Sequence, residues 1–426
     1  MINNVRKDIW VNSYPIFLWL ALEPIVGLID SKIASVINLE TLSAIGIGET
    51  IYFVFIWVFI FLAYGTTPLV SSLNTKKEIN QLNYFIKFGR NVSVILGLGS
   101  FFILFLSSDY LISTFQPTDN IQLLSSDYLI YRCIGLPFYL VNMHSTAVLR
   151  GLKYAKITFY SALIVSISNI VFSLFFGLFL GLGAGGIGFA SSLAFFCASI
   201  YSTMILKKQL NHHPSNQENI DKNTLRKKFF NVGVYILIRS LFLTIFMAYL
   251  RNRSSLMSMQ EIALQHILLQ LWSVGYIFVD AIAIASQTLI SELVSKKEKY
   301  QKSLLQKELI TVTTVISLLL ALTTFLFLEY FIEIFGGNNF NLYINLQLRA
   351  LVALSLFIGC YAFLWDGVLL GLDRSKQFSF LTIVSSIAGF LVCAYLLKTQ
   401  NTISTLWIGL NVSLVFRSLL GYVYQK

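Results

Sequence analysis

The chain contains twelve separate, largely apolar stretches, each about 20 residues long and so able to cross a lipid bilayer as a helix. Hydrophobic residues make up 56% of the chain and charged residues 12%, against about 45–50% and about 25% in soluble domains. Because a backbone in lipid must satisfy its own hydrogen bonds, the sequence predicts an all-α integral membrane protein and excludes a soluble enzyme. We expect spans near residues 13–36, 50–72, 91–108, 128–149, 157–181, 186–206, 229–250, 262–290, 309–334, 345–370, 377–397 and 403–424.

Lysine and arginine gather in the segments that face the cytoplasm if both termini lie inside. In that orientation the opposite side receives only Arg251, Arg253 and Lys398. The net charge of +11 then reflects membrane topology, and no nucleic-acid partner is expected. No targeting segment is evident, so we expect a multi-pass protein of the bacterial plasma (inner) membrane.

A sequence repeat divides the chain into halves. Residues 148–152 (VLRGL) match residues 368–372 (VLLGL), and residues 76–78 match residues 296–298, in both cases 220 positions later. Six spans return the chain to its starting side, so the halves share one orientation. We predict two homologous six-helix lobes, 1–210 and 229–426, joined by a cytoplasmic linker, 211–228. The linker histidines, His212 and His213, are read as loop residues, and no metal site is predicted.

Two carboxylates stand in the first span, Glu23 and Asp30, seven residues apart and therefore on one helix face. Pro24 removes a backbone donor between them, and Gly27 is expected to let another helix approach closely. Ionisable groups in spans are costly and are functional candidates by default. Because burial disfavours a charged carboxylate, Asp30 and Glu23 are predicted to couple proton or cation movement to function. The alternative is a structural pairing of Asp30 with Lys32 or a neighbouring helix.

The second half carries different charged residues within its spans: Arg239, Asp280 and Asp366. They are predicted to form a buried charge cluster, which either lines a substrate cavity or only balances itself. Asn169 in the fifth span is expected to bond across to another helix. His144 in the fourth span either carries a proton or is a hydrogen-bonded packing residue. None of these charges recurs at the 220-residue offset, so the scaffold is duplicated and the charges are not.

Short motifs along nearly the whole chain resemble those of one transporter family in their order. They are residues 24–31 (PIVGLIDS), 65–70 (GTTPLV), Arg150-Gly151, Ile238-Arg239-Ser240, residues 280–287 (DAIAIASQ) and 366–371 (DGVLLG). This set resembles the multidrug and toxic compound extrusion (MATE) transporters, and specifically their DinF-like branch.

The resemblance implies twelve spans in two six-helix lobes and export of drugs or metabolites driven by protons or sodium. It implies a coupling role for Asp30. The chain departs from the family pattern where Ser173 follows Asn169 in place of a second carboxylate, and where Gln287 stands in place of the branch's glutamate. In the first lobe, Asp30 and Glu23 therefore remain the main protonatable groups.

We expect a monomeric secondary antiporter in the lipid bilayer, without a cofactor, exporting a small organic substrate in exchange for H+ or Na+. The alternative is a flippase for lipid-linked saccharides or cell-wall precursors, whose diphosphate would need Arg239, Arg132 or Arg349. A channel or scaffold fits poorly with asymmetric carboxylates. The sequence holds no Walker-type motif, which argues against an ATP-driven pump.

Overall fold

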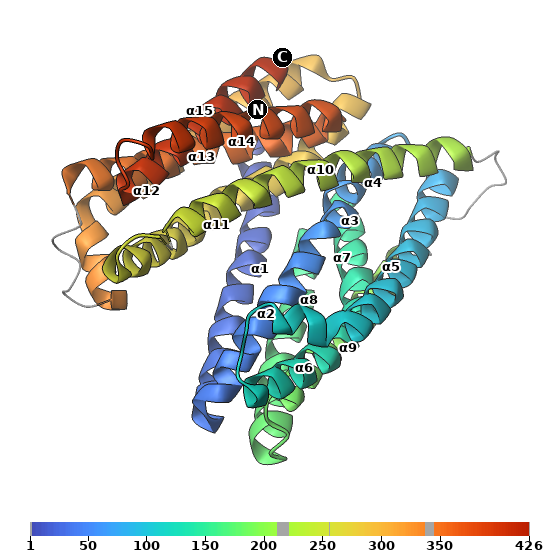
Figure 1. Cartoon of the computed structure of the whole chain (residues 1–426). Helices are drawn as coiled ribbons and strands as arrows, with labels where there is room; N and C mark the ends of the chain where they lie inside the picture. The colour runs from blue at the N-terminus through green and yellow to red at the C-terminus, as the bar shows by residue number, and fades with distance from the viewer. Residues whose placement is uncertain (1, 211–220, 255, 337–344, 426) are drawn as a thin grey trace. The chain divides into compact units, whose positions relative to one another are not determined.

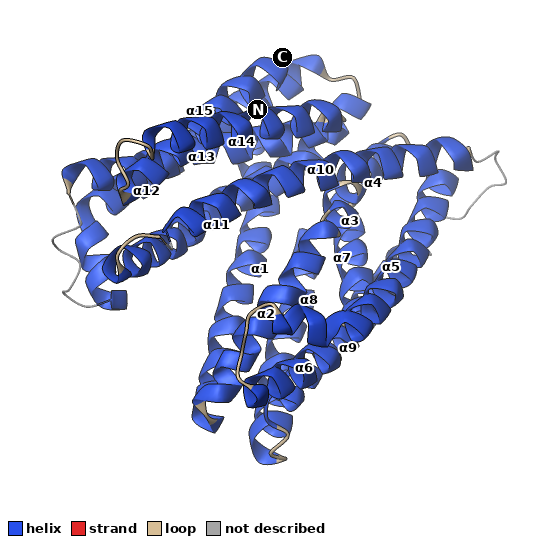
Figure 2. Ribbon diagram, in the orientation of Figure 1, coloured by secondary structure: helices blue, strands red, loops and turns tan. Residues whose placement is uncertain are grey.

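A computed structural model describes residues 2–210, 221–254, 256–336 and 345–425. These residues form helices joined by short loops, and no strand occurs among them (Figure 2). The predicted all-α class is therefore confirmed. The histidines of the expected linker, His212 and His213, lie outside the described residues.

The helices follow the expected spans in order (Figure 1). Ten helical stretches of the described chain are long and apolar enough to cross a membrane. The other two expected spans correspond to α1 and to the consecutive helices α6 and α7. The bounds are α1 (Ile2–Ile37), α2 (Leu39–Val58), α3 (Phe61–Tyr64), α4 (Thr66–Thr75), α5 (Ile79–Ser113), α6 (Asp119–Cys133), α7 (Leu136–Gly151), α8 (Ala155–Phe172), η1 (Ser173–Phe179), α9 (Gly183–Leu210), α10 (Lys222–Ser254), α11 (Met259–Ser295), α12 (Lys299–Gly336), α13 (Leu346–Gly371), α14 (Ser375–Leu396) and α15 (Ile403–Gln425).

Contacts divide the chain into two compact units. One is Leu18–Gly233, here the first unit, and the other is Met1–Phe17 together with Val234–Lys426, here the second unit. The lobe limits inferred from the sequence, residues 210 and 229, stay a prediction, as does the cytoplasmic placement of the termini.

Side-chain caps begin several helices. The Asn38 side chain accepts a hydrogen bond from the Thr41 amide at the start of α2. Asn345 caps α13 in the same way through the Leu348 amide, at 2.8 Å. Ser258 and Glu261 form a reciprocal capping box at the start of α11. Each cap satisfies a backbone donor that the helix itself cannot use, which fixes where the helix begins.

The repeat is visible in the turns that follow α4 and α11. The Glu78 amide donates to the Leu73 carbonyl, and the Glu298 amide donates to the Leu293 carbonyl, each at 3.0 Å. The residue before each of these amides, at positions 77 and 297, has a φ of 60°. This geometry closes a helix by a left-handed residue, and it occurs twice with a separation of 220 residues.

A second pair of turns, after α7 and α13, shows the same correspondence. Lys153 has a φ of 67° and Asp373 a φ of 62°. The last glycines of these helices also occupy equivalent places. A Cβ at Gly151 would lie 2.6 Å from the Thr67 carbonyl oxygen, and one at Gly371 would lie 3.0 Å from that of Gln287. Glycine is therefore required at both close approaches, and the two homologous halves share their backbone packing.

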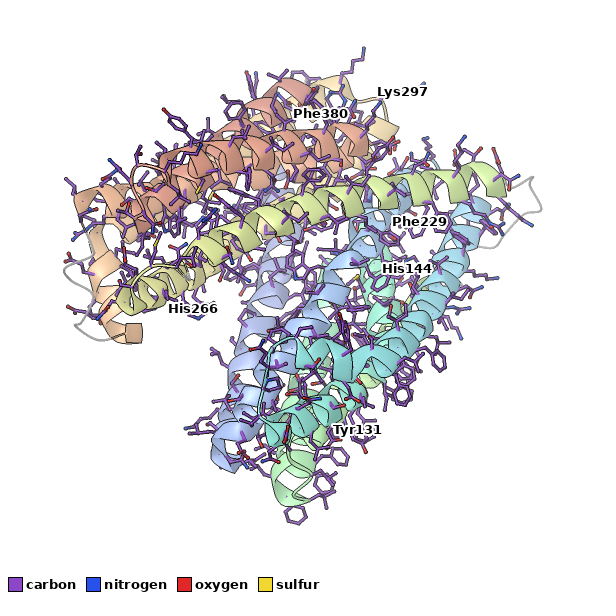
Figure 3. The ribbon with its side chains drawn as sticks, viewed as in Figure 1. Tyr131, His144, Phe229, His266, Lys297 and Phe380 are labelled. Atoms are coloured by element: carbon purple, nitrogen blue, oxygen red, sulfur yellow. The ribbon has the colours of Figure 1, made fainter. Side chains whose placement is uncertain are left out.

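His144 packs inside the first unit on α7, where Figure 3 labels it. Its Nε2 lies 3.2 Å from the Ile86 carbonyl, which can only accept, so this nitrogen carries the proton. Its Nδ1 then accepts from the Thr66 hydroxyl at 3.3 Å. Both ring nitrogens are satisfied and the side chain is fully buried, which favours the packing interpretation of His144.

Two glycines of α5 give a direct test of this packing. A Cβ at Gly89 would overlap the His144 ring, whereas one at Gly99 would meet no atom within 4 Å. We expect Gly89→Ala to destabilise the protein by about 1–3 kcal/mol, because the buried ring cannot move away freely. Gly99→Ala is the matched control and should be neutral or stabilising. Thermal unfolding in detergent measures both; equal midpoints would contradict this packing.

Candidate functional site

In the described part of the chain, each unit contains a cluster of buried charged side chains around an aspartate, and we describe the two clusters separately. The cluster of the first unit is centred on Asp30 of α1, which is 3% exposed. The cluster of the second unit is centred on Asp366 of α13, which is 7% exposed. Buried carboxylates are costly in a membrane interior, so their partners indicate what each cluster can do.

The carboxylate of Asp30 is held by neutral side chains. Ser173 Oγ donates to Asp30 Oδ1 at 2.9 Å. Ser173 is the first residue of η1, a π-helical segment that directly continues α8. Such segments are rare and often occur at functional sites. The serine that replaces an expected carboxylate is therefore a hydrogen-bond donor to Asp30.

Asn169 of α8 is the second partner. With its amide nitrogen towards α1, it donates to the two Asp30 oxygens at 3.0 and 3.1 Å, and its oxygen accepts from Ser191 Oγ of α9 at 2.8 Å. In this orientation both ends of the amide are satisfied. The bond from Asn169 across to another helix, expected from the sequence, is present.

Protonation of Asp30 would change this arrangement. A proton converts one carboxylate oxygen from an acceptor into a donor, so a partner that now donates must accept instead. The Ser173 hydroxyl can do so by rotating. The Asn169 amide can do so by turning over, which directs its nitrogen to Ser191 Oγ over the same 2.8 Å. The site can thus satisfy a charged and a neutral carboxyl group by side-chain motion alone.

Arg132 of α6 lies in the same cluster but is paired elsewhere. Its guanidinium forms an ion pair with Glu49 of α2 at 3.3 Å and donates to the Tyr128 hydroxyl. It also lies 4.6 Å from the centre of the Tyr52 ring. Glu49 is therefore a further acidic group of this lobe that the sequence reasoning did not name, whereas the view of Asp30 and Glu23 as its main protonatable groups stays a prediction.

The rest of α1 departs from the sequence reasoning. The side chain of Glu23 lies outside the described residues. Among the described residues of the first unit, a Cβ at Gly27 would meet no atom within 4 Å, so the close helix approach expected at Gly27 does not occur within this unit. Among the described residues, Lys32 makes no ion pair with Asp30. The other form of the structural alternative, pairing with a neighbouring helix, is present in the hydrogen bonds from Ser173 and Asn169, so the coupling role of Asp30 stays a prediction.

In the second unit, Asp366 binds two arginines. Arg239 Nη2 of α10 lies 3.2 Å from Asp366 Oδ2. Arg417 of α15 donates to both carboxylate oxygens, with Nε 3.3 Å from Oδ1. Each arginine also covers an aromatic ring, Arg239 on Phe378 and Arg417 on Phe363, at 4.8 and 5.2 Å. Such ion pairs with stacked guanidinium groups are the usual way to bury charge.

The two other predicted residues of this unit, Asp280 and Gln287, lie on α11. Asp280 is near enough to interact electrostatically with Asp366 and both arginines, but no hydrogen bond joins it to the described residues. Gln287 is 1% exposed, and no hydrogen bond joins it to Asp366 in the described part of the chain. The structure thus brings together Arg239, Asp280 and Asp366, and not Gln287.

The sequence reasoning overlooked Glu49, Tyr128 and Arg417 as members of the two clusters. Glu49 has a readable signal, because it is an acidic residue inside the apolar run of a span. Tyr128 stands four residues before Arg132, so both lie on one helix face. Arg417 has the same signal, a cation inside the apolar run of the last span, but its partner, 51 residues away on another helix, could not be inferred from the sequence.

The fold and these sites define a class: a multi-pass helical membrane protein with buried ionisable groups in each of two related units, as in secondary transporters. The sequence model of the MatE family matches residues 15–175 and 232–395. The chain belongs to this family of MATE membrane transporters, and it is not an enzyme.

Similar proteins include Protein DETOXIFICATION 44, chloroplastic, of Arabidopsis thaliana, 23% identical over 99% of this chain and 82% of that protein. Protein DETOXIFICATION 43 of the same plant is 21% identical over 78% of this chain. The present chain spans only 62% of the length of Protein DETOXIFICATION 43.

Among solved structures, a MATE in the bent conformation has a TM-score of 0.91 at 16% identity, over 99% of this chain and 94% of that one. A mutant of the Vibrio cholerae MATE transporter VcmN also has a TM-score of 0.91, at 15% identity, over 100% and 97%. At these identities the likeness shows the fold. The predicted fold class of twelve helices in two six-helix lobes is confirmed.

Because Asp366 pairs with two arginines, removing Asp366 and removing one arginine should lower the stability of the protein by different amounts. Asp366→Ala would leave two buried arginines facing each other, so we expect a loss of about 3–5 kcal/mol in stability. Arg239→Ala should cost less, because Arg417 still neutralises the carboxylate. Thermal unfolding in detergent ranks the stability losses of the two variants, and Glu333→Ala, at an exposed position of α12, is the control. A greater loss for Arg239→Ala than for Asp366→Ala would contradict this account of the cluster.

Proposed function

We propose that the protein is a secondary antiporter that exports drugs, toxins or organic metabolites by alternating access, coupled to proton influx through Asp30. Family membership supports transport as such, and the names of the DETOXIFICATION relatives are consistent with export. The observation that carries the coupling proposal is the contrast between the two buried carboxylates.

Asp366 forms ion pairs with two arginines, whereas Asp30 accepts hydrogen bonds only from neutral side chains. Among the described residues no cation lies within 4 Å of the Asp30 carboxylate, and Arg132 is already paired with Glu49. A proton arriving at Asp366 would have to break two buried ion pairs. A proton arriving at Asp30 requires only that a hydroxyl and an amide turn. Asp30 is therefore the better site for reversible protonation.

The finer parts of the proposal follow from the sequence. They are membership of the DinF-like branch, a monomeric state, no cofactor, and a place in a bacterial plasma membrane with both termini in the cytoplasm. Chloroplastic relatives make an organelle membrane the alternative location. Sodium is the alternative coupling ion, and Asp30 would then supply oxygen ligands.

The flippase alternative required an arginine to hold a diphosphate. The three arginines named for that task are each paired with an acid: Arg239 with Asp366, Arg132 with Glu49 and Arg349 with Glu329. A diphosphate would have to displace these carboxylates. The charge pattern therefore favours export of an organic compound over a lipid-linked diphosphate.

Asp30→Asn tests the coupling. The variant keeps the shape and can still hydrogen-bond, so it should insert and fold, yet it cannot exchange a proton. We expect at least a tenfold loss of proton-driven efflux, with substrate binding retained, since 1.4 kcal/mol of lost coupling is already tenfold. Purified protein in liposomes, with a panel of organic dyes as cargo and imposed H+ and Na+ gradients tested separately, gives the measurement.

The control is Asp109→Asn, the same chemical change at an exposed carboxylate of α5. It should transport like the unmodified protein. If Asp30→Asn transports at the unmodified rate with the same pH profile, coupling does not pass through Asp30, and the Asp366 cluster becomes the candidate. Transport driven by Na+ alone would replace the proton in the proposal.

A further inference from the structure

A groove of about 710 Å³ runs along the surface of the first unit between α5, α7 and α9. Helix α7 contacts both α5 and α9, so α5 and α9 flank α7 (Figure 1). The walls include Leu98 of α5 and Phe196 and Ile200 of α9. These side chains are 40–45% exposed, so the groove is open to its surroundings and is not closed by packing.

The groove has an apolar end and a cationic end. Arg90 of α5 and Lys207 of α9 line it together with the apolar side chains, and none of its lining residues is acidic. Helix α5 is the third span and α9 the sixth, so they run in opposite directions. Arg90 near the start of one and Lys207 near the end of the other therefore lie at the same membrane face.

The dimensions of the groove match one leaflet of a bilayer. Along α5 the lining runs from Arg90 to Phe101, and along α9 from Phe196 to Lys207. In both cases the first and last residues are eleven positions apart, or about 16 Å along the helix. Half of a hydrocarbon core is about 15 Å thick. The two cations would thus lie at the level of the lipid headgroups when the aromatic end lies near the midplane.

Neither cation is neutralised within the described part of the chain. No hydrogen bond or ion pair joins Arg90 or Lys207 to those residues, whereas Arg132 in the same unit has Glu49 as its partner. Arg90 is half-buried beside the apolar wall, and Lys207 is exposed. A half-buried guanidinium without an acidic neighbour favours an anionic ligand from outside the chain.

We propose that this groove binds one anionic phospholipid, with an acyl chain along the apolar wall and the phosphate between Arg90 and Lys207. The membrane face is that of the lysine-rich turns at residues 76–77, which attracts anionic lipid. A second copy of the chain docked symmetrically through the same groove would bring two cationic ends together, which disfavours a dimer there. The groove shares no residue with the Asp30 cluster, so the proposal stands independently of the coupling mechanism.

Native mass spectrometry of the purified protein with equal amounts of phosphatidylglycerol and phosphatidylcholine tests the site. The unmodified protein should retain the anionic lipid preferentially. Each cation near a membrane surface contributes about 1 kcal/mol, so Arg90→Gln or Lys207→Gln should lower the preference about 5-fold and the double variant about 30-fold. Lys208→Gln, an exposed neighbour outside the groove, is the control and should leave the preference unchanged.

A second variant tests the apolar part of the groove without removing the two cations. Thr203→Trp fills the groove one turn from Lys207 while keeping both cations, and it should reduce retention of both lipids. Equal retention of the two lipids by the unmodified protein would overturn the proposal. So would an equal loss in Lys208→Gln, or a dimer that Thr203→Trp dissociates while lipid retention stays the same.

Discussion

A charge inside hydrocarbon must be matched by an opposite charge or by hydrogen bonds, and this requirement organises both units of the protein. In the second unit, Asp366 of α13 forms ion pairs with Arg239 of α10 and Arg417 of α15, and Asp280 of α11 lies within electrostatic reach of all three. In the first unit, one ion pair between Arg132 and Glu49 lies beside a carboxylate that only neutral groups hold. The same physical cost is thus met by ion pairs at Asp366 in one unit and by hydrogen bonds from neutral groups at Asp30 in the other.

Much of the fold could be predicted from the sequence because a bilayer imposes a length and a polarity on every span. The apolar runs marked the helices. The second span, expected as one run at 50–72, is however divided in the structure, where Gly65 separates α3 from α4. The repeat was readable because turns and close approaches constrain the residue types that can occupy them. Which helix faces which, however, depends on rotations and tilts that leave little trace in a linear pattern.

The candidate site shows this limit in particular residues. Asp30, Arg239 and Asp366 were predicted because a charge in an apolar run is conspicuous. Ser173 was counted as a missing carboxylate, yet the π-helical start of η1 directs its hydroxyl to Asp30. The open space at Gly27 and the pairing of Arg417 with Asp366 depend on tertiary packing, which local composition does not encode.

The left-handed residues of the two repeated pairs of turns, at positions 77, 153, 297 and 373, are three lysines and one aspartate, with no glycine among these four. Their bends agree between the halves even though the charges of the spans do not. After a gene duplication, substitutions at buried charges can create new chemistry, whereas a change of bend would misdirect every helix that follows. The turns are therefore the more durable record of ancestry. An ancestral half-length protein would be reconstructed more reliably by aligning the halves through these bends than through their charged residues.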